Sequence, residues 1–208
     1  MLRRLAPALR HNMAGGLQPV SMIAAMLEKR LQSASPDLAI IAKNAAAMNA
    51  LSREAAASCM DLMTWLAPKD NAVVPAGDGI AEAIALITTD LSFRGFDVVN
   101  ETTGAPATVA RNALRNVLMA ALITLTDTFE APASVRLTAQ HEADAGFIVM
   151  DMELAKSESD IMTSSGLPAY RALDWGDVEA LAQADGVGLA HTASRAQLRF
   201  RVQTVIGA

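Results

Sequence analysis

The stretch Leu9-Arg10-His11-Asn12-Met13-Ala14-Gly15-Gly16-Leu17 is the most informative part of the chain, because it places a histidine beside the apolar seam of a long helix. From Leu17 onward the apolar residues recur in alternating steps of three and four, the spacing of a helix-bundle seam. They are Leu17, Val20, Ala24, Leu27 and Leu31. Carried back through the same heptad, Arg10 and Met13 fall on seam positions, and His11 falls beside them toward water. The sequence therefore predicts an exposed imidazole on an amphipathic helix.

Two long helices are predicted at the start of the chain. Residues 1 to about 32 form the first, with a kink rather than an end at Pro19, because Gly15 and Gly16 give the preceding turn room to bend. Ser35 is the expected cap of the second helix and Pro36 its first residue, and this helix runs to about Trp65. Its apolar residues keep the three and four alternation: Leu38, Ile41, Ala45, Met48, Ala55, Cys59 and Leu62. Residues 1–67 are thus expected to form a helical hairpin.

A single hairpin cannot cover both of its apolar faces. Pairing two copies into a dimeric four-helix bundle is the economical solution, and the many alanines let helices approach closely. The sequence therefore predicts a homodimer. The alternative is a hairpin covered by the rest of its own chain.

The predicted secondary structure changes after residue 70, where short strands alternate with helices. Strands are expected at 71–75, 96–100, 134–140, 146–154, 187–193 and 197–205. Helices are expected from Asp78 to Gly95, from Thr108 to about Phe129 and near 175–184. Residues 70–208 are thus predicted to form an α/β sandwich with helices on one sheet face, so the fold class is α+β.

Composition excludes several functional classes. Apolar residues make up 52% of the 208 residues, the formal net charge is −5 and there is one cysteine, Cys59. A single cysteine rules out an internal disulfide and a cysteine-rich zinc framework. The chain lacks a basic cluster for nucleic acid and an apolar run of about 18 residues for a membrane. With no secretory leader in the sequence, we expect a cytoplasmic protein.

The order of these parts resembles bacterial sensor histidine kinases over nearly the whole chain. Leu9-Arg10-His11-Asn12 resembles the phosphoacceptor box of the dimerisation and phosphotransfer domain. The segment from Val73 to Val99 resembles the opening of the ATP-binding domain, and 114–122 resembles the helix that carries its asparagine motif. The resemblance implies a phosphorylatable histidine and a nucleotide-binding sandwich.

Three departures from the family pattern argue against the use of ATP. The asparagine positions appear here as Ala120 and Thr124, and alanine has no oxygen ligand for Mg²⁺. The family's Asp-x-Gly-x-Gly turn is replaced by Asp151-Met152-Glu153-Leu154-Ala155-Lys156, without glycine. Residues 155–174 are too short and too poor in glycine to supply the family's lid. We therefore expect no residues that bind a cofactor or a metal.

The chain still has the histidine that phosphotransfer requires. A neutral imidazole is a good nucleophile near pH 7, so His11 can accept phosphate. Asn12 stands where active kinases commonly carry an acidic base, and its amide orients the ring without accepting a proton. Gly15 stands where relatives with phosphatase activity usually carry Thr or Asn. These two substitutions argue against autokinase and phosphatase activity. The pattern resembles the histidine phosphotransferases derived from kinases.

The expected function is that of a phosphorelay carrier. His11 is the expected phosphoacceptor, Asn12 its orienting neighbour and Arg10 a docking residue. The expected partners are response-regulator receiver domains, which would supply Mg²⁺ and the acceptor aspartate, and an upstream histidine kinase. Two alternatives stay open: a kinase with an unusual ATP site, and a scaffold without catalytic activity that binds a receiver.

Other candidate residues favour structural interpretations. His141 is expected between strands and His191 in a strand, neither with a metal-ligand neighbour. Asp151 and Glu153 are expected on a solvated strand face, and Cys59 in the core.

Overall fold

The structure is a computed structural model that describes residues 2–66, 71–102, 107–157 and 172–203. The chain divides into two compact units. One comprises Ala6–Pro68, and the other comprises Lys69–Ala208 together with Met1–Leu5. Within the described ranges, none of the helices combines the length and hydropathy that a membrane span requires.

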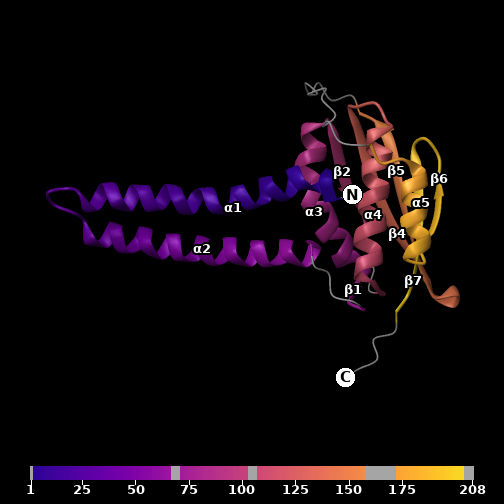
Figure 1. Cartoon of the computed structure of the whole chain (residues 1–208), viewed down its shortest axis with the longest axis horizontal. Helices are drawn as coiled ribbons and strands as arrows, with labels where there is room; N and C mark the ends of the chain where they lie inside the picture. Colours follow the sequence, from indigo (N-terminus) through magenta and orange to yellow (C-terminus); the bar gives the residue numbers. More distant parts are fainter. Residues whose placement is uncertain (1, 67–70, 103–106, 158–171, 204–208) are drawn as a thin grey trace. The chain divides into compact units, whose positions relative to one another are not determined.

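The first unit is a helical hairpin of α1 (Leu2–Leu31) and α2 (Leu38–Leu66), which run side by side in Figure 1. As predicted, α1 is one helix that continues through Pro19. The cap of α2 differs from the prediction of Ser35. The Asp37 carboxylate accepts hydrogen bonds from the backbone amides of Ala39 at 2.9 Å and Ile40 at 3.1 Å. Asp37 therefore satisfies two amides at the helix start, and α2 begins after it.

Small and aliphatic side chains hold the two helices together. A Cβ on Gly16 would lie 3.7 Å from Ala55, which is ordinary contact, so α1 and α2 approach closely at this level. Leu27, Ala55 and Leu62 are buried in the hairpin. Leu27 and Leu62 are therefore covered by the chain itself.

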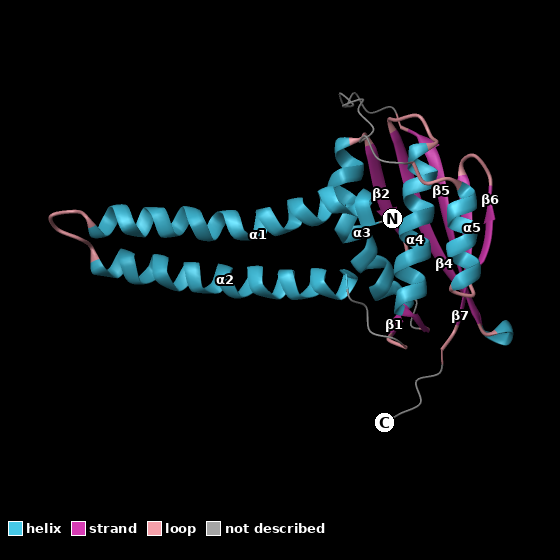
Figure 2. Cartoon of the chain, in the orientation of Figure 1, coloured by secondary structure: helices cyan, strands magenta, loops and turns pink. Residues whose placement is uncertain are grey.

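The second unit contains a mixed five-stranded sheet and a small two-stranded sheet (Figures 1 and 2). The large sheet has the strand order β2-β4-β5-β7-β6. Strands β2 and β4 pair in parallel, and the other neighbours pair antiparallel. The strands are β1 (Val73–Pro75), β2 (Phe96–Asn100), β3 (Thr108–Ala110), β4 (Ala133–Glu142), β5 (Phe147–Lys156), β6 (Gly188–His191) and β7 (Arg195–Arg201).

Helices cover one face of this sheet. They are α3 (Ala76–Phe93), α4 (Arg111–Asp127) and α5 (Trp175–Ala184), and a short 3₁₀ turn, η1 (Ala143–Ala145), links β4 to β5. Alternate residues of β5 and β7 are buried, and those between them face outward. Helix α4 lies at the centre of the core, since nearly all its residues from Ala113 to Thr126 are buried. The predicted α+β fold class, a hairpin followed by a sheet with helices on one face, is confirmed.

Two local predictions were wrong. Thr108–Ala110 was expected to be helical, but it forms β3 and pairs antiparallel with β1, with Val73 opposite Ala110. The helix therefore begins at Arg111. His141 was expected between strands, but it lies inside β4, opposite Ile148.

A buried ion-pair cluster joins distant parts of the second unit. Both carboxylate oxygens of Asp127, at the end of α4, lie 2.6 Å from Nη2 of Arg4. Arg94, at the end of α3, donates to the same carboxylate at 2.7 Å. The side chains of Arg4, Arg94 and Asp127 are 6%, 16% and 5% exposed, so water screens this cluster little.

Candidate functional site

The predicted site residues lie on α1 in the hairpin unit. Arg10 and His11 are exposed, and Asn12 is half-buried. Successive helix residues are about 100° apart, so the three side chains leave the helix in different directions. His11 therefore presents its ring to solvent, while Asn12 lies nearer to the side that packs against α2.

The surroundings of His11 are set by the way α1 packs on α2. Gly16 faces Ala55 and so marks the contact side of α1. His11 lies five residues earlier, which places it roughly 140° round the helix from that side, at about 100° per residue. The imidazole is thus carried on the outer part of a helix whose inner side is fixed by close packing.

A second feature of the hairpin is a set of exposed large apolar side chains. Met13, Leu17 and Leu31 on α1 are 43%, 49% and 58% exposed. Leu38, Met60 and Met63 on α2 are 73%, 69% and 53% exposed. We call these six residues the apolar face.

The six residues share one side of the hairpin. On each helix the exposed set is offset in the same rotational sense from the contact residue, Gly16 on α1 and Ala55 on α2. Because the helices run antiparallel, the same sense brings both sets to the same side. His11 is offset from Gly16 in the opposite sense. The apolar face and the imidazole therefore lie on different sides of the hairpin.

The positions of the expected nucleotide motifs lie in the sandwich unit. Ala120 and Thr124 are fully buried in α4. The Oγ1 atom of Thr124 has no hydrogen-bond partner in the described part of the chain. Neither side chain presents an oxygen to solvent, where a hydrated Mg²⁺ would arrive.

Asp151 does not lie at the end of a strand. It lies within β5 on the face away from the helices, where its carboxylate accepts hydrogen bonds from Arg195 at 2.8 Å and Gln197 at 3.2 Å. These cross-strand hydrogen bonds give the Asp151 carboxylate protein partners, so its presence does not require a bound ligand. The expectation about residues 155–174 falls largely on 158–171, which lie outside the described residues.

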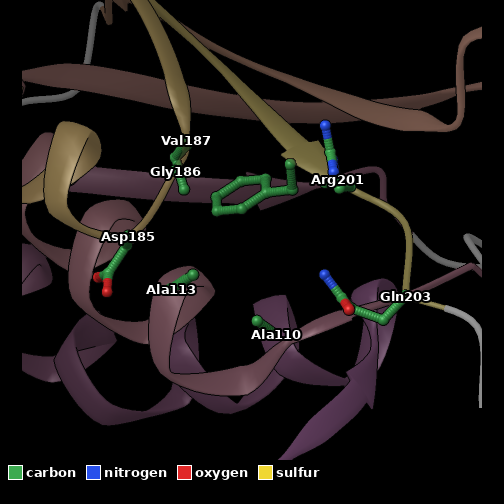
Figure 3. A pocket seen from close by; sticks show the side chains of 8 residues that line it. Ala110, Ala113, Asp185, Gly186, Val187, Arg201 and Gln203 are labelled. Carbon is green, nitrogen blue, oxygen red and sulfur yellow. The ribbon is translucent and has the colours of Figure 1, made fainter. Parts of the chain in front are cut away.

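A small hollow lies between the start of α4, the end of α5 and the end of β7 (Figure 3). Gln203 extends toward it, and Ala110 and Ala113 form one wall. On the other side, the Asp185 carboxylate accepts a hydrogen bond from Asn116 Nδ2 at 3.2 Å. The space in the hollow that is open to a water-sized molecule is about 30 Å³. Sites for drug-sized ligands occupy about 300–1,000 Å³, so this hollow is too small for a nucleotide.

The other histidines take part in local contacts. His191 lies in β6 as expected, and its ring stacks on Trp175 with centroids 4.1 Å apart. Its Nε2 is 3.5 Å from a carboxylate oxygen of Glu179. Among the described residues, no three His, Cys, Asp or Glu side chains come together in a group that could hold a metal ion.

Sequence reasoning missed the role of Arg4. Arg4 belongs to none of the motifs in the sequence, but its guanidinium is buried against Asp127. The pairing spans 123 positions, so no local spacing indicates it. Only the burial of the neighbouring Leu5, which is 1% exposed, distinguishes this turn from a solvated helix end.

The fold is similar to several solved structures. The Acinetobacter baumannii histidine kinase AdeS has a TM-score of 0.45 at 14% identity, over 88% of this chain and 95% of that one. A bacterial phosphotransferase has a TM-score of 0.43 at 12% identity, over 96% and 94% of the two chains. The Erythrobacter litoralis blue-light activated histidine kinase EL346 has a TM-score of 0.48 at 14% identity, over 89% and 63%.

With TM-scores below 0.5 and identities of 12–14%, these similarities do not indicate what activity the chain has. No family model matches the chain, and no curated protein matches it in sequence. The function must therefore be inferred from the residues themselves.

Proposed function

We propose that this chain is a phosphorelay carrier of a bacterial two-component system, which accepts phosphate on His11 from a receiver aspartate and passes it on. The observation that carries the proposal is the exposure of His11 on a side of the hairpin away from the apolar face. An imidazole in this place stays accessible when the apolar face is covered. The sensor-kinase resemblance of the stretch around His11 supports the same interpretation.

The transfer step needs little from this chain. A ring nitrogen of neutral His11 attacks the phosphorus of the aspartyl phosphate. The bond between phosphorus and the carboxylate oxygen breaks, the carboxylate leaves with the electron pair, and the ring proton passes to water. The phosphoramidate that forms is labile, and the reverse reaction returns the phosphate to a receiver.

Neighbouring residues have supporting roles in the proposal. Arg10 is exposed one residue before His11, and a guanidinium suits the carboxylates and phosphate of the partner's acceptor site. Asn12 is proposed to orient the imidazole through its amide. The receiver supplies the Mg²⁺ that neutralises charge on the transferred group.

We further propose that the carrier is a homodimer through the apolar face. Six large apolar side chains exposed on one side of a hairpin favour association, since their burial removes apolar area from water. Pairing two hairpins there forms a four-helix bundle. The proposed location is the cytoplasm.

The proposal excludes ATP as the phosphate source. The burial of Ala120 and Thr124 supports this, as does the commitment of Asp151 to Arg195 and Gln197. A kinase with an unusual ATP site is the competing function, and a scaffold without phosphotransfer is the other.

One experiment separates the three functions. The purified protein is incubated with labelled Mg²⁺–ATP and, separately, with a panel of phosphorylated receiver domains, and label on His11 is followed. Label from a receiver alone supports the carrier. Label from ATP indicates a kinase, and binding of a receiver without label from either source indicates a scaffold.

A further inference from the structure

Methionine sulfur is concentrated at one end of the apolar face. Three of the six residues of this face are methionines, Met13 on α1 and Met60 and Met63 on α2, and they are 43%, 69% and 53% exposed. The other end lies beside the turn that joins the helices and carries leucines, since Leu31 ends α1 and Leu38 begins α2. The apolar face therefore has a methionine end and a leucine end.

The packing of α1 on α2 brings the three methionines to similar levels of the hairpin. Gly16 lies opposite Ala55, and the helices run antiparallel. Met13 precedes Gly16 by three residues, so it lies level with the residue three positions after Ala55. Met60 and Met63 lie two and five residues beyond that level, roughly 3 and 8 Å along the axis at about 1.5 Å per residue. We call these three residues the methionine cluster.

A methionine side chain is apolar until its sulfur is oxidised. A hydroperoxide transfers one oxygen atom to the thioether: the O–O bond breaks, an S–O bond forms, the sulfur loses two electrons, and the peroxide is reduced to water or an alcohol. The product is a polar sulfoxide. Thiol-dependent reductases reverse the step, since two thiols give up two electrons, form a disulfide and release the oxygen as water. Oxidation of a methionine-rich association surface therefore changes how it binds.

We propose that the methionine cluster is a site of reversible oxidation by hydroperoxides, and that its oxidation keeps two copies of this chain apart. The inference rests on the proposed homodimer. In the single chain all three side chains are exposed, so a peroxide reaches them in the monomer. Pairing of two apolar faces covers them. Oxidation therefore acts on the monomer, and the sulfoxides then oppose pairing, because burial of a polar group without a hydrogen bond is costly.

The same chain provides matched methionines outside the apolar face. Met22 and Met26 on α1 are 60% and 46% exposed, so a peroxide reaches them as readily. They lie roughly 120° and 80° round the helix from Gly16, in the opposite sense to Met13, at about 100° per residue. A dimer through the apolar face leaves both uncovered. Their oxidation should therefore not affect pairing.

The first experiment measures which methionines the dimer protects. The full-length protein is treated with hydrogen peroxide at several protein concentrations, and sulfoxide at each methionine is measured by peptide mass spectrometry. The methionine cluster should oxidise more slowly as the dimer forms, in proportion to the remaining fraction of monomer, whereas Met22 and Met26 should oxidise at a constant rate. Met119 and Met150 are fully buried in the sandwich and should stay reduced, which checks that the fold is intact. Equal rates at all concentrations, in a protein that sediments as a dimer, would overturn the inference.

The second experiment measures the dimer after oxidation, by analytical ultracentrifugation. Peroxide should raise the Kd of the wild-type dimer at least about 100-fold, because each buried polar group without a partner weakens association about tenfold. Methionine sulfoxide reductase should restore the original Kd. The triple variant Met13→Leu/Met60→Leu/Met63→Leu should stay dimeric in peroxide, since leucine has a similar volume and no sulfur. The control Met22→Leu/Met26→Leu should dissociate like the wild type.

Two outcomes would overturn the inference and a third would reject the dimer. Dissociation of the triple variant by peroxide would show that other residues respond to the oxidant. Recovery of the wild-type dimer in dithiothreitol, which does not reduce sulfoxides, would assign the effect to Cys59, the free cysteine of the chain. A wild-type protein that is monomeric at every concentration before oxidation would instead reject the proposed homodimer itself.

Discussion

Arg4 and Asp127 lie 123 residues apart and form a two-pronged ion pair in which both carboxylate oxygens are 2.6 Å from the same guanidinium nitrogen. Arg94 completes the cluster from the end of α3. Two buried cations share one buried anion, so the stability of the cluster depends most on the carboxylate. The first turn of α1 is thereby a part of the sandwich unit, although its sequence is continuous with the hairpin.

Asp127→Ala should lower the free energy of unfolding of the sandwich by about 3–5 kcal/mol, because it leaves two buried guanidinium groups without their counter-charge. Urea denaturation followed by circular dichroism measures this change. Glu130→Ala is the matched control, since Glu130 pairs with Lys156 but is 81% exposed. An exposed pair contributes at most about 1 kcal/mol. If both variants lost the same free energy of unfolding, burial of the Arg4–Arg94–Asp127 cluster would add nothing to stability, and the prediction would be wrong.

Leu17→Asp should convert the dimer into monomers. Leu17 is 49% exposed in the single chain, so the carboxylate costs little in the hairpin but becomes buried when two apolar faces meet. Analytical ultracentrifugation at tens of micromolar gives the masses. Met22→Asp should stay dimeric, because Met22 is exposed on the side of α1 away from the apolar face. A wild-type protein that sediments as a monomer would contradict the prediction.

Leu27→Asp and Leu62→Asp should act differently from Leu17→Asp. Both leucines are buried within the hairpin, so a charge there should unfold the helices as well as separate the copies. Circular dichroism distinguishes the outcomes, because helical signal should fall for Leu27→Asp and persist for Leu17→Asp.

Mg²⁺–ATP at millimolar concentration should leave the thermal unfolding of the protein unchanged. A ligand at about 100 times its Kd stabilises a fold by about 2.7 kcal/mol, which a melting curve resolves readily. Differential scanning fluorimetry with and without Mg²⁺ is the measurement. A shift of Tm that requires both ATP and Mg²⁺ would favour the kinase.

His11→Gln should abolish labelling by a phosphorylated receiver while it changes the free energy of unfolding by no more than about 0.5 kcal/mol, since His11 is exposed. The dimer should persist because the imidazole lies away from the apolar face. Binding of the receiver should persist because docking also uses neighbouring residues such as Arg10. His141→Gln and His191→Gln are the controls, and both should be labelled like the wild type. Label that remains in His11→Gln would assign the phosphoacceptor to another residue.

Elements with strong local signals were predicted well. Phe96–Asn100 alternates in hydropathy and is bounded by Gly95, and it forms the edge strand β2 as expected. The last helix was placed correctly at Trp175–Ala184. Asp174 and Asp177 form a capping box at its start, and such an end is specified by adjacent residues. Residues adjacent in the sequence were therefore enough to predict where these two elements begin and end.

Features that depend on distant pairing could not be predicted. Thr108–Ala110 is a strand because Val73–Pro75 lies beside it, and a run of three residues carries too little pattern to compete with the helix that follows. The heptad that contains Leu27 and Leu62 shows that they are apolar positions, but not which helix covers them. For the same reason, spacing identified His11 as exposed, but the close packing at Gly16 required the position of Ala55.

The interior position of β7 in the large sheet affects how the protein is made. Strand β7 lies between β5 and β6, so the sheet is incomplete until residue 201 has been synthesised. The contacts of the hairpin lie within residues 6–68 and are available much earlier. Domains generally fold as units from the N-terminus during synthesis. The apolar face that we propose as the dimer surface is therefore exposed on nascent chains before either sandwich exists. This order favours pairing of copies translated from the same message.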